Sequence, residues 1–353
     1  MAEVVNYTPA EKFVHTLAFA FPRLQVAVAD AEDVLFGRSL GNARPEAPIF
    51  ITSLPRAGTT ILLRALGDVP ETATHVYRDM PFIMAPLMWA RLSAGFRKPT
   101  ILRERAHGDG LDIGYDSPEA FEEVIWHTFW PDHYGADGIR LWSKDDVSDE
   151  ARVFMERHFH KIVALRGRDR PATRYLSKNN GNIARLGLIL AMFPDAHVVV
   201  PVRHPAAHAG SLHRQHLNFL AQHAADTFTA RYMRDIGHFE FGALHRPILF
   251  DGFAERADGM SPAELDYWLT YWISAFSHLS RFKDRVHVVG YEALCNGGEA
   301  AAARLCSAVG LPPAHSGRLA RHFRAVEPAE WPEGRHAPAL RDEAAALYET
   351  FIS

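Results

Sequence analysis

The sequence predicts an α/β protein with a P-loop-like, doubly wound, mainly parallel sheet flanked by helices, and three observations lead to this prediction. Apolar runs rich in β-branched residues alternate with helical patterns, as strands joined by crossover helices require. The first run passes through a short loop of small residues into a helix start, which is the arrangement of a phosphate-binding loop. The chain has 353 residues and 48% hydrophobic content, so it is long enough to bury a large core.

The elements are expected in the following order, with residues 1–353 forming a single domain. Residues 1–45 predict one or two amphipathic helices that end near Gly41 and Asn42. Strands are expected at 48–52, 73–77, 174–177, 197–202 and 285–289, with the least clear pattern at 73–77. Residues 80–165 contain four tryptophans, a loop at 106–115 and no clear strand. We therefore expect a helical insertion there, over one edge of the sheet, where such insertions commonly form the pocket for a second substrate.

Composition and charge limit the possible partners and the compartment. The formal net charge of −4 provides no broad basic surface for nucleic acid or anionic lipid, so an anion site must be local. The apolar segment 13–21 is interrupted by Pro22 and Arg23, and no small-residue cleavage site follows. Two cysteines, Cys295 and Cys306, are too few for a disulfide framework. We expect a cytoplasmic protein with no transmembrane segment.

The loop after the first predicted strand departs from the usual nucleotide-hydrolase signature. In the pattern G-x-x-x-x-G-K-[ST], the lysine reaches the β- and γ-phosphates and the next hydroxyl binds magnesium. Here the first glycine is replaced by Ser53, the lysine by Thr59, and the cation stands earlier, at Arg56. A magnesium triphosphate is therefore a poor fit to this loop, although a phosphate group is a good one.

A second anion site is predicted after the strand at 197–202. Arg203 follows this strand, Pro205 begins a helix, and Ser211 lies eight residues beyond the arginine. Ligands of open α/β sheets bind at the carboxyl ends of the strands. A nucleotide hydrolase usually has a magnesium-binding aspartate at such a position. Two cationic sites without a metal carboxylate predict a nucleotide that carries phosphate at two separate positions, and no metal.

Together these motifs resemble those of the sulfotransferases that use 3′-phosphoadenosine 5′-phosphosulfate (PAPS), in the branch that includes bacterial and tyrosylprotein sulfotransferases. The resemblance starts with segment 55–60, Arg203 and Ser211. It continues with the lysine-bearing segment 175–180 and with 286–294, which contains Tyr291 and Glu292. A helix ending at 310–311 completes a series of motifs that spans residues 48–311.

The resemblance implies transfer of a sulfuryl group from PAPS to a hydroxyl or amine. By analogy with phosphoryl transfer, this reaction needs mainly positioning and charge stabilisation. Arg56 would hold the 5′-phosphate and the charge on the leaving oxygen, and Lys178 would lie near the sulfuryl group. The loop amides that would assist Arg56 belong to Ala57, Gly58, Thr59 and Thr60.

The same resemblance implies how the rest of the nucleotide is bound. Arg203 and Ser211 would bind the 3′-phosphate, the arginine through its forked donors, and Tyr291 would approach the adenine. The chain lacks the Arg-Lys-Gly motif of cytosolic sulfotransferases, for which residues 331–335 are only a loose equivalent. Binding of the 3′-phosphate would then depend more on Arg203.

The general base has more than one candidate. In this branch a glutamate typically follows the second strand, and Asp79 occupies that place in this chain. His75 is the next candidate, because a neutral imidazole also accepts a proton. His107 and Asp109 lie in the inserted loop and could instead contact the acceptor.

Structural explanations remain open for several of these residues. Asp79 could cap a helix start, Lys178 could be a solvated lysine in a turn, and Glu292 could be a carboxylate at a helix start. Residues 126, 127 and 130 could stack on an acceptor, but aromatic residues at helical spacing are more often core. One predicted helix carries several histidines without a recognisable metal-ligand set, and we attribute them to compositional bias and solvated helix faces; they are His204, His208, His213, His216 and His223.

Two other functional classes remain besides a sulfotransferase. A small-molecule kinase with the same sheet would turn over ATP with magnesium, which Thr59 and Arg203 argue against. A non-catalytic protein would bind the bisphosphate nucleotide and fail on every acceptor. The acceptor itself, whether a carbohydrate, a lipid or a small metabolite, and the oligomeric state are not determined by the sequence.

Overall fold

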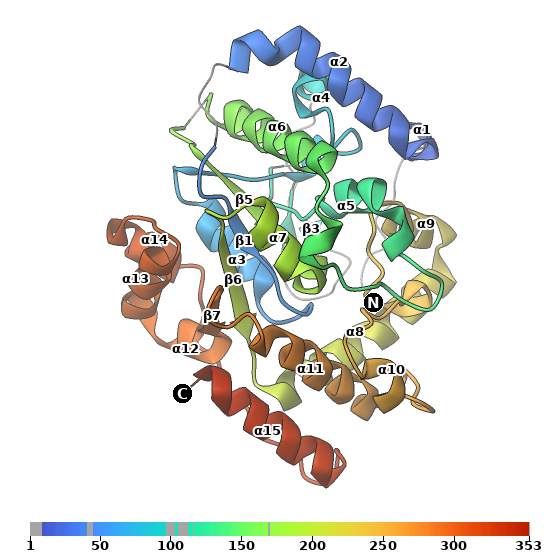
Figure 1. Cartoon of the computed structure of the whole chain (residues 1–353), viewed down its shortest axis with the longest axis vertical. Coiled ribbons are helices and arrows are strands. Elements are labelled where there is room, and N and C mark those ends of the chain that lie inside the picture. The colour runs from blue at the N-terminus through green and yellow to red at the C-terminus, as the bar shows by residue number, and fades with distance from the viewer. Residues whose placement is uncertain are drawn as a thin grey trace.

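The computed structural model describes residues 9–40, 45–96, 103–104, 112–114, 116–168 and 170–352. Figure 1 shows a central sheet with helices packed around it. The α-helices are α1 (Pro9–Ala20), α2 (Pro22–Leu40), α3 (Thr59–Gly67), α4 (Pro86–Leu92), α5 (Glu123–Phe129), α6 (Asp149–Arg166), α7 (Leu186–Met192), α8 (Pro205–Ala225), α9 (Thr227–Asp235), α10 (Phe253–Arg256), α11 (Leu265–Ser280), α12 (Tyr291–Asn296), α13 (Gly298–Ala308), α14 (Ser316–Ala320) and α15 (Pro338–Ile352).

The central sheet confirms the predicted fold class. Its five strands run in the order β2-β5-β1-β6-β7, and every neighbouring pair is parallel. The first strand therefore lies in the middle, and later strands are added on both of its sides, as in a doubly wound sheet. The strands are β1 (Ile49–Ile51), β2 (Thr72–Ala73), β5 (Arg174–Lys178), β6 (His197–Val202) and β7 (His287–Gly290).

Side chains alternate between the two faces of this sheet, and each face has its own core. Ile49 and Ile51 belong to a core cluster with residues of α3 and α13. Phe50, between them, belongs to a second cluster with residues of α6, α7 and α11. Residues 198–200 of β6 alternate in the same way. Because successive residues of a strand face opposite sides, a continuous apolar run is what a sheet covered on both faces requires.

Strand positions agree with the predicted ones within two residues at most ends, and β6 has the predicted bounds. The exception is the strand expected at 73–77. It is reduced to the two residues of β2. Residues 74 and 75 have no regular secondary structure, and a 3₁₀ turn begins at Tyr77. Among the described strands β2 pairs only with β5, so it is an edge strand with half the ladder contacts of a central one.

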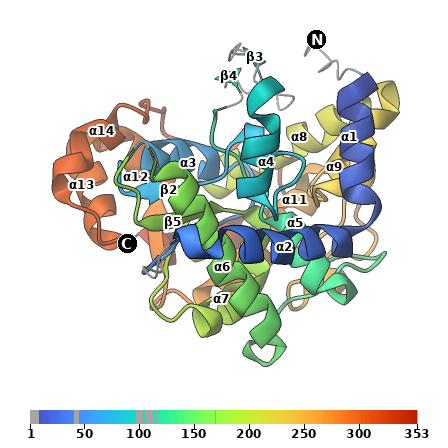
Figure 2. The same cartoon turned by 90° about the horizontal axis from the view of Figure 1, so that it is seen from above.

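The described part of 1–45 forms the helices α1 and α2, and α2 ends at Leu40, next to the end expected near Gly41 and Asn42. In both views, α1 and the pair α13 and α14 lie on opposite sides of the molecule (Figures 1 and 2). The described part of 80–165 is mainly helical, with α4, α5 and α6. The expectation of no strand there was wrong: β3 (Arg103–Glu104) and β4 (Asp112–Ile113) form an antiparallel pair. A pair of two-residue strands is too short to give a recognisable pattern in sequence.

The aromatic residues of α5 are core residues. Trp126 and Trp130 are buried, and their rings stack with centroids 4.9 Å apart. Trp126 also donates its indole N–H to Glu122 at 2.8 Å. The structural explanation is therefore confirmed for both tryptophans. Within the described residues, every helix is too short or too polar to serve as a bilayer-spanning segment.

Candidate functional site

Four strands deliver functional side chains to one end of the sheet. The loop at 52–58 follows β1, Lys178 ends β5, Arg203 follows β6, and Tyr291 follows β7. All four strands are parallel, so their carboxyl ends meet at the same edge, where open α/β sheets bind ligands. The sequence-predicted candidates from these four segments are thus brought together.

The loop after β1 has an unusual backbone. Arg56 has φ 73°, and Gly58 has φ 97°. Such left-handed residues next to a helix start point successive N–H groups into a shared concavity, which suits an anion. Gly58 also tolerates close contact: a Cβ at this position would lie 2.5 Å from Cδ2 of Tyr291. The glycine therefore lets the aromatic ring pack directly against the loop.

Hydrogen bonds connect the two predicted cationic sites. Arg56 donates its Nε–H to Oγ of Ser211 on α8 at 3.3 Å. Arg203 donates from Nη1 to the backbone oxygen of Arg56 at 3.2 Å, and its guanidinium lies 5.3 Å from the centroid of the Tyr291 ring. Arg56, Arg203, Ser211 and Tyr291 therefore form one cluster rather than separate surfaces.

A buried histidine also holds the loop. His208 of α8 donates its Nε2–H to the backbone oxygen of Pro55 at 2.7 Å. Burial, together with the nearby Arg203 and Arg56, lowers the pKa of His208 to about 3, although the bond to Pro55 acts in the opposite direction. The ring is neutral near pH 7 and acts as a donor that fixes the loop without adding charge.

The start of α3 is linked to β5 and to a later segment through one asparagine. Thr59 donates its hydroxyl to Oδ1 of Asn180 at 3.1 Å. Asn180 in turn donates Nδ2–H to Oε1 of Glu240 at 3.4 Å, and its backbone oxygen accepts the hydroxyl of Thr52 at 3.3 Å. The side-chain amide of Asn180 thus connects the start of α3 to the carboxylate of Glu240, sixty residues after Asn180.

A pocket of about 600 Å³ opens beside this loop. A volume of this size falls within the range of small-ligand sites. Arg203, Ser211 and Ala57 are not among its described lining residues, and the first two contact Arg56 instead. The predicted residues that line the pocket are Arg56, Gly58, Thr59, Thr60, Lys178 and Tyr291.

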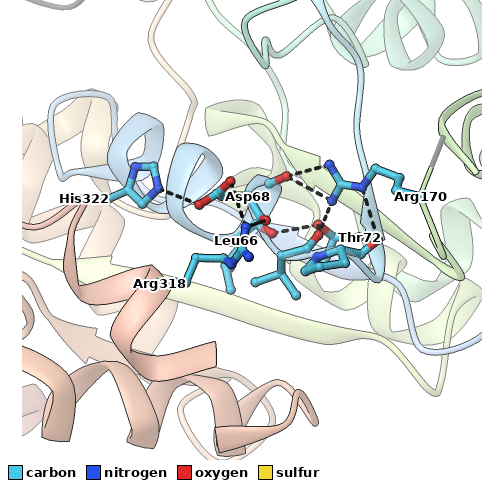
Figure 3. A network of polar contacts seen from close by, with 9 residues as sticks. Leu66, Asp68, Thr72, Arg170, Arg318 and His322 are labelled. Carbon is cyan, nitrogen blue, oxygen red and sulfur yellow. Dashed lines mark hydrogen bonds and ion pairs between the residues drawn. The ribbon is translucent and has the colours of Figure 1, made fainter. Parts of the chain in front are cut away.

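The pocket also contains cations that sequence reasoning missed. Arg321 and Arg324 line it together with His322. They follow α14, and a polar network fixes this helix against the end of α3 (Figure 3). Arg318 and His322 both contact the side chain of Asp68, at 3.5 Å and 3.4 Å. These residues do not follow a predicted strand. The only signal in the sequence that could have indicated them is the close spacing of the arginines.

On the other side of Asp68, Arg170 completes the network in Figure 3. Its guanidinium donates to the backbone oxygens of Gly67 and Pro70, among others. Thr72 donates to the oxygen of Leu66 at 2.7 Å. These bonds satisfy carbonyl groups that the end of a helix leaves without partners. The network therefore stabilises the end of α3 to which the segment with Arg321 and Arg324 is attached.

A second, smaller pocket of about 40 Å³ adjoins the first. Its lining is mostly apolar and includes Phe239, Trp268 and Tyr271. Glu123 and Arg246 contribute charged groups. Lys178 lines both pockets and is 8% exposed. The solvated-lysine explanation is therefore wrong for Lys178, because its side chain lies at the junction of two pockets.

Asp79 lies in a buried polar network and is not among the described lining residues of either pocket. Its carboxylate pairs with Arg166 at 2.5 Å and with His75 at 3.1 Å, and it accepts the backbone N–H of Val76 at 2.9 Å. His75 also contacts His158 across 2.8 Å. Burial alone would raise the pKa of Asp79, but Arg166 and His75 outweigh burial and hold it at about 2. These contacts favour a structural role, and the base assignment stays a prediction.

Replacing Asp79 with asparagine should destabilise the fold and leave turnover of the folded protein intact. The depressed pKa of Asp79 corresponds to about 2 kcal/mol of stability at neutral pH. This stabilisation is present above the ordinary carboxyl pKa of 3.8 and is lost as the pH falls toward 2. Chemical denaturation of Asp79→Asn measures it. Asp251→Asn, which breaks an exposed pair with Arg281, is the control and should cost less than about 1 kcal/mol. Lost turnover with unchanged stability would instead identify Asp79 as the base.

The described part of the structure does not bring the other candidates for the acceptor side, His75, His107 and Asp109, into one site. His107 and Asp109 lie outside the described residues. His75 is buried beside Asp79 and His158, outside the described lining of both pockets.

Glu292 accepts the backbone N–H of His204 at 3.0 Å and the Tyr348 hydroxyl at 3.3 Å, which agrees with a structural carboxylate.

The histidines of α8 are structural rather than solvated, which corrects the expectation for three of them. His208, His216 and His223 are buried. The rings of His216 and His223 accept the backbone N–H groups of Gly242 and Ala243, each at 3.2 Å. Burial lowers the pKa of His216 to about 4, so its ring is neutral and able to accept. Among the described residues, no group of three or more potential ligands is arranged to hold a metal ion.

These features define an α/β protein with a phosphate-type loop and an adjoining ligand pocket at the carboxyl ends of its strands. The sequence model of the Sulfotransferase family matches residues 48–246, which is more than half of the chain. The matched segment includes Arg56, Lys178 and Arg203. The chain belongs to the sulfotransferase family.

Two solved sulfotransferase structures are similar to this chain, and the first of them supports its fold. The sulfotransferase STF9 from Mycobacterium avium superposes with a TM-score of 0.52 and 16% identity, over 99% of this chain and 87% of that one. The sulfotransferase STF1 from Mycobacterium tuberculosis H37Rv gives a TM-score of 0.42 and 14% identity, over 92% and 81% of the two chains. No curated protein sequence matches the chain.

Proposed function

We propose that this sulfotransferase uses PAPS and transfers its sulfuryl group to a hydroxyl or amine of a carbohydrate, a lipid or a small metabolite. One observation carries the proposal: Arg56 and Arg203 are joined by a hydrogen bond at a loop with two left-handed residues. A pocket of about 600 Å³ opens beside it, and its lining contains three further arginines, Arg64, Arg321 and Arg324. Such a concentration of cations suits a ligand with several phosphate-type groups.

The residues of the loop would hold the end of the nucleotide where the reaction occurs. Arg56 and the N–H groups of residues 57–60 would bind the 5′-phosphate and stabilise the charge that develops on the leaving oxygen. The ammonium of Lys178 would lie beside the sulfuryl group. The acceptor oxygen forms a bond to sulfur while the bond between sulfur and the bridging oxygen breaks, and the acceptor proton passes to a base.

The 3′-phosphate has two candidate sites. Arg203 and Ser211 are the predicted pair, and in the structure both contact Arg56. Arg321 and Arg324 line the pocket directly. Arg203 would then act partly by supporting the loop, and the C-terminal arginines would supply part of the positive charge. Tyr291, which packs on the loop and lines the pocket, remains the proposed adenine contact.

The acceptor would enter through the smaller pocket. Its aromatic and aliphatic lining suits an apolar group next to the reacting hydroxyl or amine, because burial of apolar surface is favourable. Cys295 and Cys306 are both free and buried, which is compatible with the proposed cytoplasmic location.

Calorimetry tests the nucleotide assignment against the two alternatives. We expect adenosine 3′,5′-bisphosphate to bind with the same affinity with or without a chelator of divalent ions. ATP with magnesium should bind more weakly, since Thr59 stands where a kinase of this type has lysine. Transfer of labelled sulfuryl from PAPS then separates an enzyme from a binding protein. Tighter binding of magnesium ATP than of the bisphosphate would contradict the proposal and favour a kinase.

A further inference from the structure

The two pockets meet at a small group of side chains. Five described residues line both of them: Pro55, Lys178, Asn180, His238 and Glu240. If the nucleotide occupies the larger pocket and the acceptor the smaller one, as proposed above, the transfer takes place at this junction. A base for the reaction must reach the acceptor oxygen there.

Glu240 is held at this junction from two sides. Its Oε1 accepts Nδ2–H of Asn180 at 3.4 Å, and the Asn180 amide is oriented by the hydroxyl of Thr59 at 3.1 Å. Its backbone oxygen accepts Nδ1–H of His245 at 2.7 Å. The Glu240 carboxylate is therefore connected to Thr59, the first residue of α3, through two hydrogen bonds of Asn180.

The segment after Glu240 is itself fixed. The N–H groups of Gly242 and Ala243 are bound by the buried rings of His216 and His223 on α8. Such second contacts keep a reacting group in position without taking part in the chemistry. The carboxylate is thus preorganised although it belongs to a connecting segment.

Other carboxylates near the pockets have both of their oxygens engaged by groups of the protein. Glu123 accepts from Arg185, Tyr134 and Asn179. Glu119 accepts the hydroxyl of Tyr77 on one oxygen and the N–H of Ala120 on the other. Among the described residues, Glu240 makes a single side-chain hydrogen bond, that from Asn180. It therefore keeps capacity for an incoming hydroxyl.

We propose that Glu240 is the general base for sulfuryl transfer, an assignment that rests on the proposed function. The acceptor hydroxyl donates its hydrogen bond to the Glu240 carboxylate while its oxygen attacks sulfur. As the new S–O bond forms and the bond to the bridging phosphate oxygen breaks, the proton moves to Glu240. The electron pair leaves with adenosine 3′,5′-bisphosphate. Lys178, on the same junction, is the residue proposed to lie beside the sulfuryl group, so Glu240 is the carboxylate left to accept this proton.

The test compares acceptors that do and do not carry a proton to lose. Benzyl alcohol must be deprotonated during transfer, whereas 4-nitrophenol is largely ionised slightly above neutral pH; water serves as a third acceptor through release of labelled sulfate. Glu240→Gln should lose about 10²- to 10⁴-fold in kcat with benzyl alcohol and with water. It should lose less than about 10-fold with 4-nitrophenolate, for which no base is needed.

Chemical rescue separates catalysis from a structural effect. Glu240→Ala leaves space for a small carboxylate, so added formate should restore turnover of benzyl alcohol in this variant and not in Glu240→Gln. Affinity for adenosine 3′,5′-bisphosphate should stay within about twofold in both variants, since the phosphates contact other residues. Glu255→Gln, an exposed carboxylate on α10, is the matched control and should behave as wild type.

The remaining outcomes distinguish failure of the Glu240 assignment from failure of the proposed function. If wild type binds the bisphosphate and Glu240→Gln transfers to benzyl alcohol at the wild-type rate, Glu240 is not the base. If His238→Ala alone loses turnover, the base is His238, the other titratable acceptor at the junction. If wild type neither binds the bisphosphate nor releases sulfate from PAPS with any of the three acceptors, the proposed function fails and the assignment of Glu240 fails with it.

Discussion

Adenosine 3′,5′-bisphosphate should bind at least about 30-fold more weakly to Arg56→Ala and to Arg203→Ala than to wild type. Removing one partner of a buried charged hydrogen bond costs about 2 kcal/mol or more, which is a factor of about 30 in the dissociation constant. The two arginines contact each other through Nη1 of Arg203 and the oxygen of Arg56. Titration calorimetry on the folded variants measures both losses.

A second ligand distinguishes direct contact from support of the loop. Adenosine 5′-monophosphate lacks the 3′-phosphate, so Arg203→Ala should weaken it much less than the bisphosphate if Arg203 binds that group. If Arg203 acts only by holding the loop, both ligands should weaken equally. Ser211→Ala removes the neutral partner of Arg56 and should cost about 1 kcal/mol. Arg256→Ala, which breaks an exposed pair with Glu343, is the control. Unchanged affinity in both arginine variants would contradict the nucleotide assignment.

The sequence was sufficient to predict the parts of the site that follow a strand directly. Arg56, Lys178 and Arg203 each stand just after an apolar run, and parallel strands bring such positions to one edge of the sheet. The pattern of residues 197–202 specified β6 without error because every residue but the first is buried. Periodicity is informative where burial is continuous.

The missed residues are those whose position depends on tertiary packing. Glu240 lies in the segment between α9 and α10. Its place depends on its own bond to Asn180 and on the bonds that tie the neighbouring Gly242 and Ala243 to histidines of α8. Arg324 reaches the pocket because α14 is attached to the end of α3. No local pattern encodes such contacts, since the partners are up to 254 residues apart. The same limit applies to Asp79, whose partner Arg166 is 87 residues away.

The largest loss of stability is expected for Glu123→Gln, which should destabilise the protein by about 3–5 kcal/mol. Arg185 is 0% exposed, and Glu123 is its acidic partner at 2.8 Å. The faces of Trp126 and Trp142 lie 4.6 Å and 4.4 Å from the guanidinium carbon. Glutamine has nearly the same shape, so the substitution removes the charge and leaves the buried guanidinium without its ion-pair partner.

The neighbouring carboxylate provides a matched control, because Glu122 is equally buried and accepts from the neutral groups of Trp126 and Tyr175. Glu122→Gln should therefore cost only about 1 kcal/mol. The pH dependence identifies the cause. Burial alone would raise the pKa of Glu123, but Arg185 outweighs it and holds the pKa below the ordinary 4.5. The stabilisation is present above pH 4.5 and is lost as the pH falls through the folded-state pKa. Denaturation curves of wild type and Glu123→Gln should thus converge in acid, and an equal gap at every pH would show that the loss comes from packing rather than from the ion pair.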